Sequence, residues 1–335
     1  MRLIIFWKGL LKMEIFNLTL TQMLMMFTLI LVGFFLRKKN IVPENSYVTI
    51  AKLETFVLSP ALNCYNQLTK CTVENFLNNW KLMFYGLALV LVAIAIACPA
   101  SALFIKHSTE DQKEAYQRNI YKYALTFGNY GFMGNFIVLG IWGSDMFYKY
   151  TMFTFFIALF CSGWGLYILI PKQTGGNAFW KNLKKGLTAP PMLGILIGCV
   201  CGLCNLSRFF PEFFMKALSN ASNCMGPIAM ILAGVVIGGY HFKSLLTKKK
   251  VYVVTFLRLI VIPAIFVLIL KTLGTSDEIL SFVLIAFATP IGMNTIVYPG
   301  AYGGDTKTGA SMTMISHVLS VITIPLMYLI FVVLM

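Results

Sequence analysis

Seven long runs without Asp, Glu, Lys or Arg constrain this chain more than any other feature of its sequence. Each run is long enough for the roughly 20 residues that a helix needs to cross a hydrocarbon core about 30 Å thick. A transmembrane barrel would show short alternating segments instead of continuous apolar ones. The chain is therefore predicted to be an all-α polytopic membrane protein. The runs cover residues 15–36, 82–105, 123–144, 150–170, 217–240, 279–304 and 308–335.

The composition excludes several other classes of protein. Hydrophobic residues make up 58% of the 335 residues and charged residues only 12%, about half the share of a soluble domain. The net charge of +15 does not indicate nucleic-acid binding, because the basic residues lie in short loops between spans, where orientation signals belong. Cys199, Cys201 and Cys204 have no His, Asp or Glu nearby. We interpret them as small packing residues and predict no metal or cofactor.

Ten transmembrane helices fit the pattern, in two halves of five. The first half covers residues 17–170 and the second 188–335, joined by a cytoplasmic linker at 171–187. Residues 1–16 are either an interfacial segment or an upstream extension. Most Lys and Arg fall in loops on one side, which the positive-inside rule assigns to the cytoplasm, so both termini are predicted outside. The spans are expected at 17–36, 47–67, 82–104, 119–142, 147–170, 188–206, 213–239, 251–272, 277–299 and 308–334.

Spans 4 and 9 both break the helix rules near their middle. Span 4 contains FGNYGFMGN at residues 127–135, and span 9 contains FATPIGMNT at 287–295. Glycines weaken a helix, and a proline removes a backbone donor and clashes with the preceding turn. An odd number of spans per half inserts the halves with opposite orientation, and paired breaks in an inverted repeat are the best pointer to a transporter binding site. Glycines spaced by three residues would also suit close helix packing.

The chemistry expected at these breaks suits an anion. The half-helix that follows each break presents unpaired N–H groups and a positive dipole end. The amides of Asn129 and Asn294 would then orient a carboxylate without a buried fixed charge. The substrate-binding residues predicted at the breaks are Asn129, Tyr130, Gly131, Asn135, Pro290 and Asn294.

Motifs along nearly the whole chain resemble the auxin efflux carrier family. NYGFMG at residues 129–134 resembles its fourth-span signature, and LETFVLSPAL at 53–62 resembles its second span. APP at 189–191, TP at 289–290 with Asn294, YGGD at 302–305 and SHVLSVITIP at 316–325 follow in the family's order. The resemblance implies the ten-span fold of bile-acid symporters and a sodium/proton antiporter, with spans 4 and 9 crossing near the midplane. It also implies a pocket lined by residues 60–63, which adds Pro60 and Asn63 to the predicted substrate-binding residues. It further implies a bacterial-type protein of the plasma (inner) membrane.

One departure from the family pattern concerns the first break. Family members usually carry a proline shortly after the position of Gly134, where this chain has Asn135 and Phe136. The first break then rests on glycine alone, and Asn135 is a candidate for a compensating hydrogen-bonding group.

Ionisable residues inside spans are functional candidates by default. Glu54 and His317 are candidates for proton coupling, although a buried neutral histidine and a snorkelling or loop-paired glutamate are equally simple structural interpretations. Arg258 in span 8 is expected to pair with Glu54 or to bind carbonyl groups at a helix C-terminus. Asp305 is interpreted as the start of the helix of span 10.

The leading hypothesis is a secondary active transporter that moves a small organic anion, such as a mono- or dicarboxylate, by alternating access. H⁺ and Na⁺ are the candidate coupling ions, with uniport left open, and a homodimer in the lipid bilayer is the candidate assembly. The alternative is a non-transporting receptor that keeps the carrier fold and binds a ligand. An enzyme is not expected, because no serine–histidine pair, His-Glu-x-x-His motif or paired aspartates appear.

Overall fold

The computed structural model describes residues 2–43, 45–106, 111–170, 184, 186–240, 246–301 and 304–334. Every regular element within these ranges is a helix, which confirms the predicted all-α class. The predicted linker at 171–187 falls almost entirely outside the described residues, as do His241 and residues 302–303.

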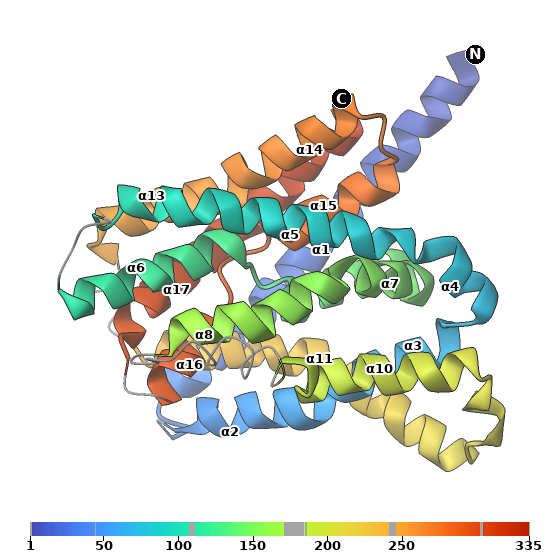
Figure 1. The fold of residues 1–335 in the computed structure, drawn as a ribbon, viewed down its shortest axis with the longest axis horizontal. Helices are drawn as coiled ribbons and strands as arrows, with labels where there is room; N and C mark the ends of the chain where they lie inside the picture. The colour runs from blue at the N-terminus through green and yellow to red at the C-terminus, as the bar shows by residue number, and fades with distance from the viewer. Residues whose placement is uncertain are drawn as a thin grey trace.

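The helices follow one another in the order shown in Figure 1. The first half contains α1 (Arg2–Lys38), α2 (Ser46–Leu53), η1 (Glu54–Leu58), α3 (Ser59–Lys70), α4 (Val73–Asn79), α5 (Lys81–Ala100), η2 (Ser101–Leu103), α6 (Gln112–Thr126), η3 (Tyr130–Gly134), α7 (Asn135–Phe160), η4 (Cys161–Gly165) and α8 (Leu166–Leu169). The second half contains α10 (Pro190–Leu203), η5 (Leu206–Phe209), α11 (Glu212–Gly238), α13 (Lys249–Phe256), η6 (Leu257–Val261), α14 (Ile262–Thr272), α15 (Asp277–Ala288), α16 (Asn294–Ala301), α17 (Thr306–Tyr328) and η7 (Leu329–Leu334).

Helix covers most of each predicted span, and spans 4 and 9 are interrupted at residues 127–129 and 289–293. Among the described residues, six helical stretches are long and apolar enough to cross a membrane, and the multi-pass class follows from them. One of these stretches, Tyr130–Leu169, covers 40 residues and contains a bend at Gly143, whose φ is 76°. Glycine reaches this left-handed region without the steric penalty that a side chain brings. The bend lies in the predicted loop between spans 4 and 5.

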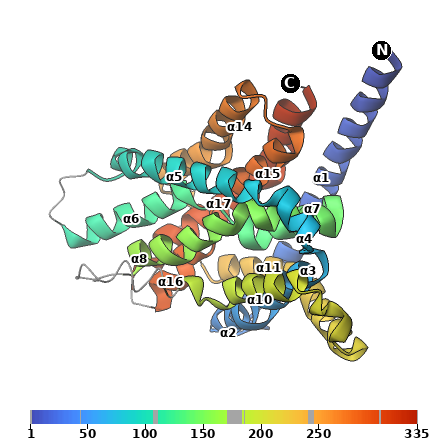
Figure 2. The ribbon, with the colours of Figure 1, turned by 45° about the vertical axis from the view of Figure 1, so that its right-hand side comes forward.

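α1 begins at Arg2, so residues 2–16 continue the first predicted span as part of one helix of 37 residues. Figures 1 and 2 show the first turns of α1 extending away from the rest of the molecule. Both figures also show the N-terminus and the C-terminus at the same end of the bundle. Two ends on the same side are what an even number of spans requires.

The helices divide into two units that pack mainly within themselves. The first unit, here called the four-span unit, consists of α1, α2 to α3, α10 and α11. A Cβ added at Gly194, Gly198 or Gly202 would lie 2.5 to 2.7 Å from a backbone oxygen of α3, so α10 and α3 pack at the distance that only glycine permits. Gly33 and Gly234 bring α1 and α11 together in the same way. Small residues are typical of such close contacts in membranes.

The second unit, here called the crossover unit, consists of α5 to α8 and α13 to α17. Aromatic rings fill its interior: Phe153 and Phe282 have centroids 6.0 Å apart, and Phe266 and Phe287 meet edge to face at 4.9 Å. Figure 2 shows α2, α3, α10 and α11 together on one side and the helices of the crossover unit on the other. Helix α17 begins at Asp305, whose carboxylate accepts from the backbone N–H of Thr308 at 3.1 Å, as the helix-start interpretation expects.

Two turns of π-helix interrupt spans 2 and 8, and a proline follows each of them. In η1 the N–H of Ser59 donates to the oxygen of Glu54, and Pro60 comes next. In η6 the N–H of Ile262 donates to the oxygen of Leu257, and Pro263 comes next. Proline lacks the N–H that the α-helical pattern needs, and a π-turn before it absorbs the mismatch.

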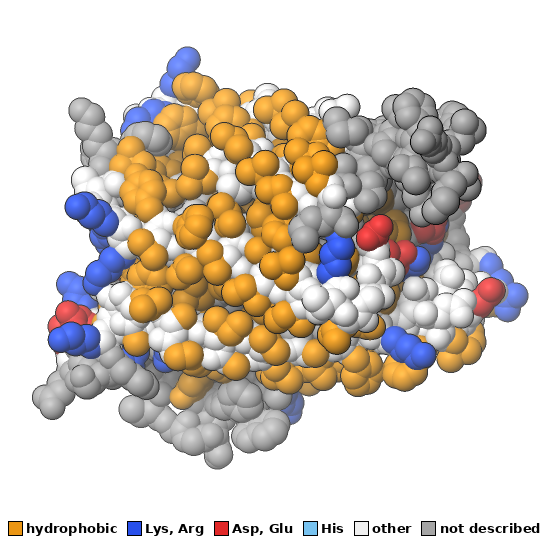
Figure 3. Space-filling view, turned by 90° about the horizontal axis from the view of Figure 1, so that it is seen from above, with side chains coloured by type: hydrophobic (Ala, Val, Ile, Leu, Met, Phe, Trp, Pro, Cys, Tyr) orange, Lys and Arg blue, Asp and Glu red, His pale blue; other side chains and the backbone are white. Residues whose placement is uncertain are grey.

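The surface fits a protein surrounded by lipid. Figure 3 shows hydrophobic side chains over the middle of one face, with most charged side chains toward its left and right margins. Large exposed hydrophobic residues include Phe56, Val200, Phe256 and Ile322, which are each more than half exposed. Such broad exposed apolar surface is expected of a membrane protein and rare in a soluble monomer.

Candidate substrate site at two helix breaks

The breaks in spans 4 and 9 lie side by side. Helix α6 ends at Thr126 and η3 starts at Tyr130, while α15 ends at Ala288 and α16 starts at Asn294. Between them, Gly128 and Ile291 form an antiparallel bridge, and the N–H of Asn129 donates to the carbonyl oxygen of Pro290 at 2.7 Å. Backbone groups freed inside a membrane must find partners, and here each break supplies partners for the other.

Arg258 holds the helix ends that lead into the two breaks. Its side chain is fully buried, and its Nη1 donates to the carbonyl oxygens of Leu125 and Thr126, at 3.3 and 3.1 Å. Its Nη2 donates to Ala286 O at 3.1 Å. These carbonyls lie at the C-terminal ends of α6 and α15, where the helix dipole is negative and a cation is favoured. The carbonyl-binding hypothesis for Arg258 is confirmed, and the ion pair with Glu54 is not formed.

Gly128 leaves the space that this arrangement needs. A Cβ at this position would lie 2.5 Å from Nη2 of Arg258 and 2.7 Å from the carbonyl oxygen of Thr289. Gly131 differs, because nothing lies within 4 Å of a Cβ built there. The glycine at 128 is therefore required by packing, whereas the glycine at 131 borders open space.

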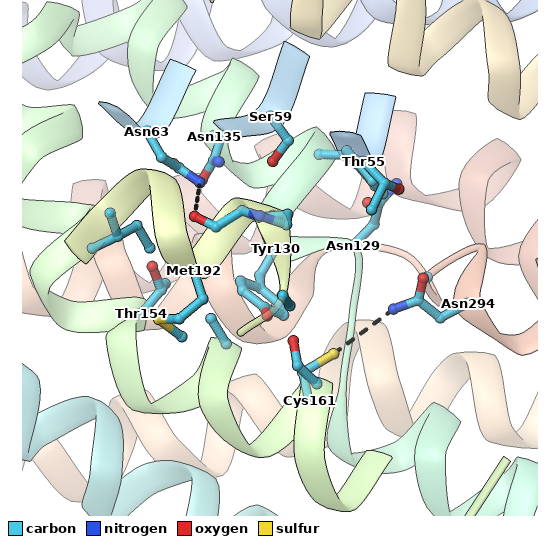
Figure 4. Close-up of a pocket in the computed structure, with 18 of the residues that line it drawn as sticks. Thr55, Ser59, Asn63, Asn129, Tyr130, Asn135, Thr154, Cys161, Met192 and Asn294 are labelled. Carbon is cyan, nitrogen blue, oxygen red and sulfur yellow. Dashed lines mark hydrogen bonds between the residues drawn. The ribbon is translucent and has the colours of Figure 1, made fainter. Parts of the chain in front are cut away.

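That open space is a cavity of about 150 Å³ between the two units. Spans 2 and 6 of the four-span unit border it on one side, and the two breaks and span 5 border it on the other. None of the described residues that line it carries a charge. Figure 4 shows polar side chains converging on it. Its hydroxyl and side-chain amide groups come from Thr55, Ser59, Asn63, Asn129, Tyr130, Asn135, Thr151, Thr154, Ser162, Asn294 and Tyr298.

Six of the eight predicted binding residues line this cavity, and two do not. The six are Asn63, Asn129, Tyr130, Gly131, Asn135 and Asn294. Pro290 contributes its carbonyl oxygen to the bridge between the breaks. Pro60 packs its backbone against α10, where its carbonyl oxygen would be 2.5 Å from a Cβ at Gly194.

Two helix N-termini reach the cavity. Asn129 is the N-cap of η3, and its side-chain oxygen lies 3.5 Å from the N–H of Met133. The backbone from Gly128 to Phe132 and from Gly292 to Asn294 lines the cavity wall. The N–H groups of Met133 and Gly134 donate to Asn129 O, and those of Thr295, Ile296 and Val297 donate to Gly292 O and Met293 O. The cavity thus lies at the positive dipole ends of both helices.

His317 lies behind Asn129, outside the cavity. Its Nδ1 is 2.8 Å from the carbonyl oxygen of Thr313, and its Nε2 is 3.3 Å from Nδ2 of Asn129. Because a carbonyl only accepts, Nδ1 carries the hydrogen, and Nε2 accepts from the asparagine amide. His317 is thus a neutral, hydrogen-bonded residue that orients Asn129.

Asn294 is oriented in a comparable way by residues of spans 4 and 5. Its Nδ2 donates to the Tyr123 hydroxyl at 2.7 Å and lies 3.8 Å from the sulfur of Cys161. The hydroxyl of Tyr123 in turn lies 3.0 Å from the same sulfur. Second-layer contacts of this kind fix the plane of each amide relative to the cavity.

Sequence reasoning missed the hydroxyl groups of the site. Thr151 and Thr154 line the cavity from span 5, three residues apart on one helix face. Polar residues at that spacing in an apolar span were the available signal. Thr55 and Ser59 line it from span 2, again within about one turn. Asn135, proposed as a compensating group, faces the cavity, while its neighbour Phe136 packs its ring against Gly226.

Glu54 is buried beside the site without lining it. Its exposed fraction is 0%, and neither carboxylate oxygen has a hydrogen-bond partner. The next residue, Thr55, does line the cavity. The two candidates for proton coupling therefore differ. Both ring nitrogens of His317 form hydrogen bonds, and neither carboxylate oxygen of Glu54 does.

Comparison with known proteins gives one clear match. A sequence model of the membrane transport protein family matches residues 18–328, nearly the whole chain. No curated protein matches significantly. The matched range includes both helix breaks and every residue that lines the cavity. This protein belongs to the membrane transport protein family, the auxin efflux carriers, and is a membrane transporter.

Proposed function

We propose that the protein is a secondary active transporter that moves a small mono- or dicarboxylate by alternating access. The observation that carries this proposal is the convergence of two helix N-termini on an uncharged cavity lined by hydroxyl and amide groups. Each helix N-terminus is equivalent to about half a positive charge. Together with oriented N–H and O–H donors, two such ends stabilise a carboxylate.

The absence of a lining cation suits a carrier, whose ligand must leave as well as enter. A buried Arg–carboxylate pair is costly to separate, whereas dipoles and neutral donors bind an anion more weakly. Arg258 is occupied with helix carbonyls and contributes only to the shape of the breaks.

Cavity size supports a small substrate. The volume of about 150 Å³ equals that of an engineered cavity that accepts benzene, a molecule of about six heavy atoms. Acetate, lactate, malonate and succinate fall near this size, and bile acids do not.

Contacts at one end of the cavity support a state that is closed to the outside. Near the predicted outer surface, Lys70 of span 2 pairs with Asp145 at 2.7 Å. With its amide oriented for hydrogen bonding, Asn66 donates to Ser144 O at 3.2 Å and accepts from the N–H of Tyr148 at 3.3 Å. These contacts join the four-span unit to the crossover unit. We infer that they separate when the units move and the site opens to the outside.

We also propose that the ten spans form two inverted repeats of five, in the plasma membrane, with both termini outside. Matching breaks in spans 4 and 9 and the position of the two chain ends support this arrangement (Figures 1 and 2). The coupling ion is proposed to be a proton, because the carboxyl group of Glu54 is buried without a hydrogen-bond partner.

The test is a thermal-shift screen of acetate, lactate, malonate, succinate and malate, followed by uptake of the best ligand into proteoliposomes. A ligand that binds only the folded protein raises its melting temperature. Asn129→Ala, Asn294→Ala and Gly131→Ala should each reduce both the shift and the uptake. Asn220→Ala, an exposed position on α11, is the matched control and should change neither.

Binding without uptake would identify a receptor and overturn the carrier proposal. A shift that survives both Asn129→Ala and Asn294→Ala would move the site away from the breaks. If none of the carboxylates binds or is transported, the substrate class is wrong.

A further inference from the structure

Glu54 is an acidic residue that the packing leaves without any partner. It begins the π-turn η1 in span 2, and both of its carboxylate oxygens are buried without a hydrogen bond. Arg258, equally buried, has three carbonyl partners. A buried polar group without a partner in a native structure requires an explanation.

The helices around Glu54 explain why no partner is available. Outside its own span, η1 packs mainly against α11 and α10. The stretch of α11 from residue 225 to 238 reads MGPIAMILAGVVIG, and α10 reads PPMLGILIGCVCGL. Apart from two cysteine thiols, neither stretch has a polar side chain. Glu54 therefore sits against apolar side chains and helix backbone.

Other titratable groups on these elements are engaged elsewhere or lie at a distance along the helix. On α11, Glu212 and Lys216 pair with each other at 2.7 Å in the first two turns. On span 2, Lys52 is exposed and Lys70 pairs with Asp145. The remaining titratable side chains on the packed elements are Tyr47, Cys64 and Tyr65 of span 2, Cys199 and Cys201 of α10, and Cys224 of α11.

An ionised carboxylate in this position would be strongly destabilising. Removing an unpaired charge from water costs several kcal/mol even after relaxation. A neutral carboxylic acid costs far less, because only its polar groups lose water. A metal ion is a poor alternative, because hard cations take about six oxygen ligands, and no cluster of acidic, histidine or cysteine side chains exists among the described residues.

A polar pocket of about 260 Å³ lies on the predicted cytoplasmic side of Glu54. Tyr47 lines it, and Tyr47 precedes Glu54 by seven residues. That spacing places both residues on one face of the helix, about 10 Å apart along its axis. Ile50 and Ala51, which pack against the core, lie between them on this face.

Both units contribute to this pocket. Arg37, the charged residue among those that line it, lies in α1 of the four-span unit, and Tyr47 lies in α2 of the same unit. Ile296 and Thr306 belong to α16 and α17 of the crossover unit. A relative movement of the units would therefore reshape the pocket. The same movement would reshape the substrate cavity, which Thr55 borders.

We propose that Glu54 is a proton-binding site of this carrier, protonated when buried as here and open to water through the pocket beside Tyr47 when the units move to open the cytoplasmic side. The step breaks the O–H bond of the acid and transfers the proton to water, leaving a carboxylate. This inference rests on the proposed function and assigns the coupling role to Glu54 in place of His317.

Infrared spectroscopy of the purified protein tests the protonation state directly. At neutral pH the wild type should show the carbonyl band of a protonated carboxylic acid, and Glu54→Gln should lack it. Glu278→Gln is the matched control, because Glu278 is ion-paired with Lys149 at 2.8 Å and should not contribute to the band. An identical band in the wild type and Glu54→Gln would overturn the assignment.

Uptake of radiolabelled succinate into proteoliposomes tests the coupling. With one proton per substrate, the accumulation ratio should change about tenfold for each unit of pH gradient, since a tenfold ratio corresponds to about 1.4 kcal/mol. Glu54→Gln should respond to a succinate gradient but not to a pH gradient, and the control Glu278→Gln should keep the pH response.

The two proposals can fail separately. Wild-type uptake that ignores a pH gradient would overturn the role of Glu54 and leave the carrier proposal intact. If the wild type transports no succinate while another carboxylate of the screen is transported, the same measurement is made with that carboxylate. Absence of uptake for the whole screen contradicts the carrier proposal, and the infrared band still decides whether Glu54 is protonated.

Discussion

Arg258 and Glu54 occupy similar positions in the two units of the molecule, yet their surroundings are opposite. Each lies in a π-turn that precedes a proline, and each has an exposed fraction of 0%. Arg258 faces the C-terminal ends of two broken helices, and Glu54 faces the continuous helices α10 and α11. Broken helices present free carbonyl groups, and continuous helices present none.

The difference shows what a buried charge requires in this fold. The breaks in spans 4 and 9 create unpaired acceptors as well as a substrate site, and Arg258 satisfies those acceptors. No break accompanies Glu54, so its carboxyl group has no structural partner to lose. Arg258 should therefore be essential for folding, whereas Glu54 should be dispensable for folding and important for function.

The largest effect is expected for Arg258→Met. This change leaves the carbonyls of Leu125, Thr126 and Ala286 without their donor, and each buried acceptor left unsatisfied costs about 1–3 kcal/mol. Thermal unfolding in detergent should show a strongly lowered melting temperature or loss of folded protein. Arg258→Lys should retain part of the stability, because a cation remains. An unchanged melting temperature for Arg258→Met would contradict the comparison.

The next effect concerns the glycines beside Arg258. Gly128→Ala introduces a Cβ 2.5 Å from the guanidinium nitrogen, and overpacking of this kind costs about 1–3 kcal/mol. Gly131→Ala places its methyl group in open space and should leave the melting temperature unchanged while weakening ligand binding. Equal stabilities for the two variants would show that Arg258 adjusts easily and is held less firmly than described.

Glu54→Leu is expected to act in the opposite direction to Arg258→Met. Replacing an unpartnered buried carboxyl group by an apolar side chain should stabilise the protein by about 1 kcal/mol or leave it unchanged. The melting temperature measures this, with Glu54→Gln as the variant that keeps a polar group of similar shape. A marked fall in stability for Glu54→Leu would mean that the carboxyl group has a structural partner.

The smallest effect is expected for a half-exposed ion pair within the crossover unit. Lys149 and Glu278 lie 2.8 Å apart, with side chains 31% and 32% exposed. Such pairs contribute about 0.2–1 kcal/mol and weaken with added salt. A double-mutant cycle with Lys149→Ala and Glu278→Ala measures the coupling. A value as large as the effect of Arg258→Met would remove the distinction between buried and exposed charges drawn above.

The helix breaks were predictable from the sequence, because glycine and proline act locally. The glycines and the proline at 127–135 and 287–295 disfavour helix in any surroundings. Asn129 and Asn294 belong to the same two motifs, and both line the cavity. The absence of a proline after Gly134 did not abolish the first break, since the bond from Asn129 N–H to Pro290 O supports it. Local chemistry is thus sufficient where the backbone itself is constrained.

Partners that come from distant spans were not predictable. Whether Arg258 meets Glu54 or helix carbonyls depends on which helices pack together, and span 8 alone contains no such information. Thr151 and Thr154 read as ordinary polar residues of a span until its neighbours are known. Pro60 and Pro290 attract notice as helix breakers, but a proline shapes the backbone and need not contact a ligand.

The hydrogen bond between Asn129 and Pro290 has a consequence for substrate selection. It joins the two breaks directly, and Arg258 joins the helices that precede them, so we expect Asn129 and Asn294 to move together. Their separation should then stay constant throughout the transport cycle. We expect the carrier to act as a molecular ruler, which selects among carboxylates by the distance between their polar ends.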